Sequence, residues 1–150
     1  MSHTLTTLLP LHGITIPDEL IADAEIPVLT EPQRQGDVMI IPLAMLSAAD
    51  AKIAAKTAAE RAVPVTAKGV AVVRGEATGN THLLHADPGS VVSWVPGPGG
   101  TSLLLGLLTV ESGVAWLIHT DEHGANGIGP GQYSLHGKQE QADLIRRVAD

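Results

Sequence analysis

The stretch SVVSWVPGPGGTSLLLGLLTVESGVAWLIH, residues 90–119, decides the fold class of this chain. It holds three apolar runs of strand length, at 90–95, 102–110 and 113–119. A Gly/Pro cluster separates the first two runs, and Glu111-Ser112-Gly113 separates the last two. Short apolar runs bounded by turn residues are typical of buried strands. The second separator, a short polar turn, predicts a β-hairpin.

The same pattern continues on both sides of this stretch. Apolar runs at 38–41, 70–73 and 81–85 come before it, and a last run at 129–136 follows it. Regularly spaced short strands with Gly and Pro between them favour two packed sheets or one closed sheet. The sequence therefore predicts a mainly β, single-domain β-sandwich or small barrel.

Two segments depart from the β pattern. Residues 47–62 are rich in alanine, the best helix former, with Ser47 placed to cap the helix and Asp50 in its first turn. This segment predicts one inserted α-helix, which Pro64 ends. Residues 139–148 place their large apolar side chains on one helical face, which predicts a short C-terminal helix.

The first 33 residues form an extended N-terminal arm ahead of a β-rich domain at 34–150. The arm contains many large apolar side chains, and Pro27 and Pro32 keep its last part extended. Two interpretations are open: the arm covers the surface of its own domain, or it packs on a neighbouring subunit. Because so much apolar surface is unfavourable in water, we expect the arm to cross a subunit boundary.

Composition excludes several classes of function. The 150 residues carry a formal net charge of −7, which argues against nucleic acid as a partner because phosphate binding depends on Lys and Arg. With no cysteine, the chain has neither disulfides nor thiolate metal ligands. No apolar run is long enough to span a membrane, and residues 1–12 lack the pattern of a signal peptide. We expect synthesis in the cytoplasm and no membrane partner.

Two polar segments at the ends of predicted strands hold the residues suited to chemistry. Residues 75–82 include Glu76 and His82, and residues 119–124 include His119, Glu122 and His123. His and Glu side chains are ligands for zinc and iron, so the metal candidates are Glu76, His82, His119 and His123. No pattern indicates a catalytic nucleophile or a bound cofactor, and for each histidine alone a structural role is the simpler interpretation.

Several motifs in order carry a resemblance to a family. They are RQGDV at 34–38, GExTGxxH at 75–82, HxxEH at 119–123, GxY at 131–133 and the ending IRRVAD at 145–150. This order resembles an uncharacterised family of small β-rich proteins from actinobacteria and their phages. Asn80 stands where that family pattern has the first histidine of an HxH pair. The resemblance implies a phage or prophage setting.

Two functions from different classes follow. The first is a non-catalytic structural or assembly protein that forms homo-oligomers and contacts other virion proteins, as a capsid decoration or cement protein does; its final location would be the virion. The second is a cupin-like metal-binding protein or enzyme that uses the His/Glu site on a small molecule. Because Asn80 replaces an imidazole ligand, we expect no tightly bound metal and favour the first.

Overall fold

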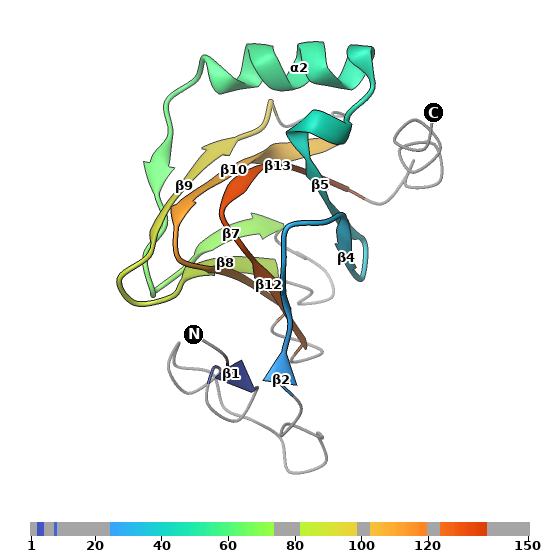
Figure 1. Ribbon diagram of the computed structural model, residues 1–150. Helices are drawn as coiled ribbons and strands as arrows, with labels where there is room; N and C mark the ends of the chain where they lie inside the picture. Colours follow the sequence, from blue (N-terminus) through green and yellow to red (C-terminus); the bar gives the residue numbers. More distant parts are fainter. Residues whose placement is uncertain are drawn as a thin grey trace.

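The computed structural model describes residues 3–4, 8, 25–73, 82–98, 103–119 and 124–137. Over these residues the protein is mainly β, with two large sheets stacked face to face and a helix on one outer face (Figure 1). The sheets remain open, so the fold is a β-sandwich rather than a closed barrel. The predicted fold class is confirmed. The expected C-terminal helix at 139–148 lies outside the described residues.

The larger sheet has six strands in the order β4-β5-β13-β10-β9-β6, and all neighbouring strands are antiparallel. The strands are Gln33–Gln35 (β4), Val38–Pro42 (β5), Val63–Pro64 (β6), Val91–Pro96 (β9), Leu104–Ser112 (β10) and Gly131–His136 (β13).

The smaller sheet has five strands in the order β3-β12-β11-β8-β7. They are Val28–Leu29 (β3), Val70–Val73 (β7), His82–Ala86 (β8), Ala115–His119 (β11) and Gly124–Ile128 (β12). Only the β3–β12 pair is parallel. A separate two-stranded ribbon joins His3–Thr4 (β1) and Glu25–Ile26 (β2).

The main core lies between the two sheets and follows the alternation of each strand. On β5, Val38 and Ile40 enter this core, while Met39 and Ile41 pack on the other face of the sheet. Side chains of successive strand residues point to opposite faces, so one strand supplies two layers. Because the chain lacks Phe, the core contains mainly aliphatic side chains, with Trp94 and Tyr133 among them.

The helix α2, Ala48–Ala58, covers the outer face of the six-stranded sheet (Figure 1). The Ser47 side chain accepts a hydrogen bond from the Asp50 backbone N–H at 3.3 Å, as predicted for the helix start. Ala54 packs on Leu104 and Leu107 of β10. The 3-10 turn η1, Leu43–Met45, connects β5 to this layer.

The turn at 111–113 does not form the predicted hairpin. β10 belongs to the six-stranded sheet and β11 to the five-stranded sheet, so the chain crosses from one sheet to the other here. Gly113 has φ +81°, and the Val114 N–H donates to Ser90 Oγ at 2.9 Å. The turn signal was correct, but the partner of each strand depends on long-range pairing that a local pattern does not contain.

The outer face of the five-stranded sheet is also covered. Trp116 and Ile118 of β11 point away from the main core and form a second cluster with Leu8 and Ile26 of the arm. All five residues of β11 are therefore buried. For Leu8 and Ile26, the arm covers its own domain, in contrast to the expectation that these residues pack on a neighbouring subunit.

Tyr133 provides a spectroscopic test of the core. Its side chain is 1 % exposed, its hydroxyl donates to the Gly129 carbonyl at 2.8 Å, and burial raises its pKa. Since Tyr133 is the only tyrosine, the tyrosinate absorbance near 295 nm reports this residue alone. We expect an ionisation midpoint above about 10 in the folded protein and near 10 in denaturant.

The same shift determines how stability changes with pH. Above about pH 10 the unfolded chain releases the phenolic proton while the folded chain retains it, so the free energy of unfolding falls as pH rises. Below that pH both states hold the proton, and Tyr133 contributes no pH dependence. This fall should be smaller in Tyr133→Phe, which has no proton to release. A folded-state midpoint at or below 10 would contradict the buried position of the hydroxyl.

Candidate functional site

The two described histidines of the predicted site lie side by side at one end of the sandwich. On the inner face of the five-stranded sheet, β8 and β11 pair Ala86 with Ala115, Leu84 with Leu117, and His82 with His119. The first two pairs belong to the main core, and the histidine pair continues the same row. The two rings stack, with centroids 4.1 Å apart and planes 6° from parallel. Both side chains are 4 % exposed.

The edge strand β4 of the opposite sheet faces this histidine pair. Gln33 and Gln35 are opposite the core residues Ile40 and Val38, so both glutamines point inward and are buried. Arg34 between them is exposed, and its Nε donates to the Gly36 carbonyl at 3.0 Å. The RQGDV motif is thus a tight turn at 36–37 with an inward glutamine immediately before it.

The glutamines form a hydrogen-bonded chain with Asn126 of β12. Gln33 Nε2 donates to the Gly127 carbonyl at 2.9 Å, and Asn126 Nδ2 donates to Gln33 Oε1 at 3.2 Å. Gln35 Nε2 donates to Asn126 Oδ1 at 3.0 Å and to the Leu117 carbonyl at 2.6 Å. Gln35 Oε1 lies 2.8 Å from His82 Nδ1. The chain connects both sheets.

Backbone carbonyls set the direction of this chain. A carbonyl oxygen only accepts, so the amide nitrogens of Gln33 and Gln35 must face Gly127 and Leu117. The oxygen of Gln35 then faces His82, which requires a proton on His82 Nδ1. In its neutral form the ring therefore carries its lone pair on Nε2. The direction of the whole network follows from donors and acceptors alone.

The structure brings together His82 and His119 among the four metal candidates. Glu76 and His123, and also Glu122, lie outside the described residues. Gln33, Gln35 and Asn126 were missed as site residues because β4 and β12 were not predicted as strands. The available signal was the Gln-Arg-Gln alternation before the turn, which places two amides on one face if it is read as a strand.

The stacked rings do not fit a shared metal ion. A metal binds imidazole nitrogen in the plane of the ring, at about 2.0–2.1 Å. The two stacked planes, 6° from parallel, do not meet at a point within bonding distance of both rings. Among the described residues, no group of three or more His, Asp or Glu side chains could hold a metal. The described part of the site is a hydrogen-bonded network of amide and imidazole side chains.

Two other buried histidines, His85 and His136, have structural contacts. His85 Nδ1 lies 2.8 Å from the Ala67 carbonyl, and His136 Nε2 lies 2.9 Å from Ser134 Oγ. Both side chains are buried. The His85 contact connects β8 to the turn at residues 67–68, whereas the His136 contact lies within β13.

Removal of the central amide should weaken the sandwich. We expect Gln35→Ala to lower the free energy of unfolding by about 1–3 kcal/mol, because it leaves buried partners at His82 and Asn126 without their hydrogen bonds. Gln132→Ala on the exposed face of β13 is the matched control and should change it by less than about 0.5 kcal/mol. Denaturant unfolding measures both variants. Equal losses in the free energy of unfolding would show that the hydrogen-bonded network contributes nothing to stability.

The fold and the site define a class: a small two-sheet β protein whose core ends in a network of amide and imidazole side chains. The family model described as a domain of unknown function (DUF8820) matches residues 34–138, so the chain belongs to that family. The matched range begins at Arg34 and contains Gln35, His82, His119 and Asn126. No curated protein and no solved structure matches the chain. Among the described residues, no helix is long and apolar enough to cross a membrane.

Proposed function

We propose that this protein is a non-catalytic structural protein that acts through contacts between subunits, as a phage virion component of the capsid decoration or cement type. The observation that carries the proposal is the Gln35–His82 contact. The side chains of Gln35, Asn126 and His82 hydrogen-bond to one another, and Gln35 connects β4 to the opposite sheet. Such a network stabilises a scaffold and offers no activated nucleophile.

Charge and sequence resemblance support the same proposal. The acidic surface disfavours nucleic acid, and the motif order resembles proteins from actinobacteria and their phages. The metal-binding alternative is less well supported, because the stacked rings of His82 and His119 do not converge on one ion. The protein would be made in the cytoplasm and would end in the virion.

The direct test is the oligomeric state of the full-length chain. We expect light scattering, over a range of concentrations, to show trimers or larger rings that persist in chelator. A monomer at every concentration would contradict the proposal. Elemental analysis of the same sample tests the alternative: near-stoichiometric Zn, Fe, Mn or Ni that is lost in His82→Ala would favour the metalloprotein.

A further inference from the structure

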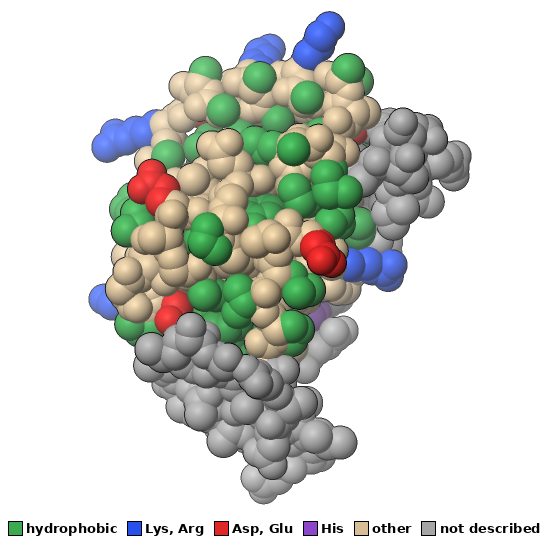
Figure 2. Space-filling view, in the orientation of Figure 1, with side chains coloured by type: hydrophobic (Ala, Val, Ile, Leu, Met, Phe, Trp, Pro, Cys, Tyr) green, Lys and Arg blue, Asp and Glu red, His purple; other side chains and the backbone are tan. Residues whose placement is uncertain are grey.

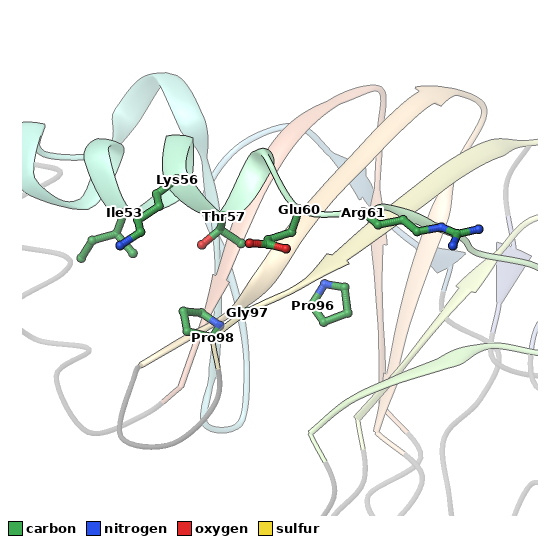
Figure 3. Close-up of a pocket in the computed structure, with 8 residues that line it drawn as sticks. All are labelled: Ile53, Lys56, Thr57, Glu60, Arg61, Pro96, Gly97 and Pro98. Carbon is green, nitrogen blue, oxygen red and sulfur yellow. The ribbon is translucent and has the colours of Figure 1, made fainter.

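A pocket lies under the C-terminal end of α2, at the opposite end of the molecule from β1 and β2 (Figure 1). Its volume is about 580 Å³, within the usual range of ligand pockets of about 300–1,000 Å³. Residues at the end of α2 lie over the end of β9 and the residues that follow it (Figure 3). The lining residues are Ile53, Lys56, Thr57, Glu60, Arg61, Pro96, Gly97 and Pro98.

The pocket combines apolar walls with a net positive charge. Ile53 is 47 % exposed although it is the largest apolar residue of α2, and Pro96 and Pro98 provide the opposite wall. Lys56 and Arg61 outweigh the single acid Glu60. Lys and Arg side chains also stand out from the α2 end in the space-filling view (Figure 2). A positive apolar pocket on a chain of net charge −7 favours an acidic, apolar occupant.

The arm has that chemistry. Residues 1–33 contain five acidic side chains and no lysine or arginine, so the arm contributes −5 to the formal net charge of −7. Within it, residues 17–24 read PDELIADA, in which the apolar pair Leu20-Ile21 is flanked by Asp18, Glu19 and Asp23. An apolar pair between acids suits apolar walls between cations.

The positions of Leu8 and Ile26, which lie on either side of this segment in the sequence, indicate that the occupant belongs to another copy. Leu8 and Ile26 are buried on the outer face of the five-stranded sheet, whereas α2 covers the outer face of the six-stranded sheet. Both sheets lie between these two surfaces (Figure 1). A contact between the arm and the α2 pocket therefore joins two molecules head to tail, and a repeated head-to-tail contact produces a ring or a filament.

We propose that the pocket beneath α2 binds the acidic segment at residues 17–24 of a second copy of this chain. The inference rests on the proposed assembly function and identifies the surfaces that perform it. Lys56 and Arg61 pair with the acids of the arm, and Ile53 and the two prolines pack on Leu20 and Ile21. Because Lys56 and Arg61 are exposed, rising salt should weaken the assembly.

Charge exchange between two variants tests the contact. Variant A carries Lys56→Glu and Arg61→Glu, and variant B carries Asp18→Lys, Glu19→Lys and Asp23→Lys. We expect each variant alone to be monomeric, by light scattering, at concentrations where the natural chain assembles. A mixture should assemble again, because the acidic arm of A meets the basic pocket of B, and the basic arm of B meets the acidic pocket of A.

A matched control separates specific pairing from net charge. Lys52→Glu with Lys68→Glu changes net charge as much as variant A does, at exposed positions that do not line the pocket, and should leave assembly unchanged. Circular dichroism should show the same β-rich spectrum for every variant. A third outcome is that the unmixed sample of variant A is monomeric and that mixing it with variant B does not restore assembly. In that case another surface of the second copy fills the pocket, and the assignment of the arm as the occupant is wrong.

Other outcomes separate this inference from the proposed function. If A and B each assemble as the natural chain does, the pocket contact is wrong, while assembly through another surface remains. If the natural chain is itself monomeric at every concentration, both the assembly function and the pocket contact are wrong.

Discussion

Trp116→Ala is expected to lower the free energy of unfolding by about 3–5 kcal/mol, the usual loss when a buried aromatic side chain is truncated. Trp116 is fully buried on the outer face of β11, in a cluster with Ile118, Leu8 and Ile26. Its Nε1 also donates to Asp87 Oδ1 at 3.2 Å. Truncation removes the centre of the cluster that connects the arm to the sandwich.

Three comparisons make this prediction specific. Trp116→Phe keeps most of the ring but loses the donor to Asp87, so it should cost about 1–3 kcal/mol. Val91→Ala, at a side chain that is 52 % exposed, should cost less than about 0.5 kcal/mol. A double-mutant cycle of Trp116→Ala with Leu8→Ala should show a coupling energy, because the two residues share one cluster. Strict additivity would mean that Leu8 does not cover Trp116.

Gly106→Ala should destabilise the main core through overpacking. An alanine Cβ at this position would overlap Trp94 Cζ2 and lie 2.5 Å from the Val95 carbonyl oxygen. Trp94 is 2 % exposed and the oxygen belongs to the backbone, so neither has room to move. We expect a loss of about 1–3 kcal/mol in the free energy of unfolding, and more if β9 and β10 separate.

Gly124→Ala is the matched control for Gly106→Ala. It also lies in a strand, but its added Cβ meets no atom of the described residues within 4 Å, so its effect should stay within about 0.5 kcal/mol. Denaturant unfolding of both variants tests the difference. Equal effects would show that Trp94 does not pack directly on β10 at Gly106.

The strands with apolar sequences were predictable because a short apolar run between turn residues by itself indicates a buried strand. β8, β9, β10 and β11 coincide with apolar runs to within about two residues, and α2 begins at its predicted cap. β12 was not predicted, since GANGI has few residues that favour a strand. It forms because it pairs with β11 on one side and with β3 on the other.

The site was predictable in part for the same reason. His82 and His119 were singled out because each lies at the end of an apolar strand, and the structure makes them cross-strand partners. Gln35 was named only within a motif, and nothing local indicates that its amide reaches Leu117, 82 positions further along the chain. Long-range contacts of this kind follow from how the two sheets stack.

By itself the sequence determined the fold class, where the helix begins and which strand ends carry polar side chains. Each of these depends on apolar runs, helix capping or turn residues, which involve only residues close together in the sequence. The tertiary structure decided that β10 and β11 belong to different sheets, that Leu8 and Ile26 cover Trp116, and that Gln35 sets the direction of the bond to His82. Each of these depends on which surfaces meet when two sheets pack, and that choice is made by burial across the whole chain.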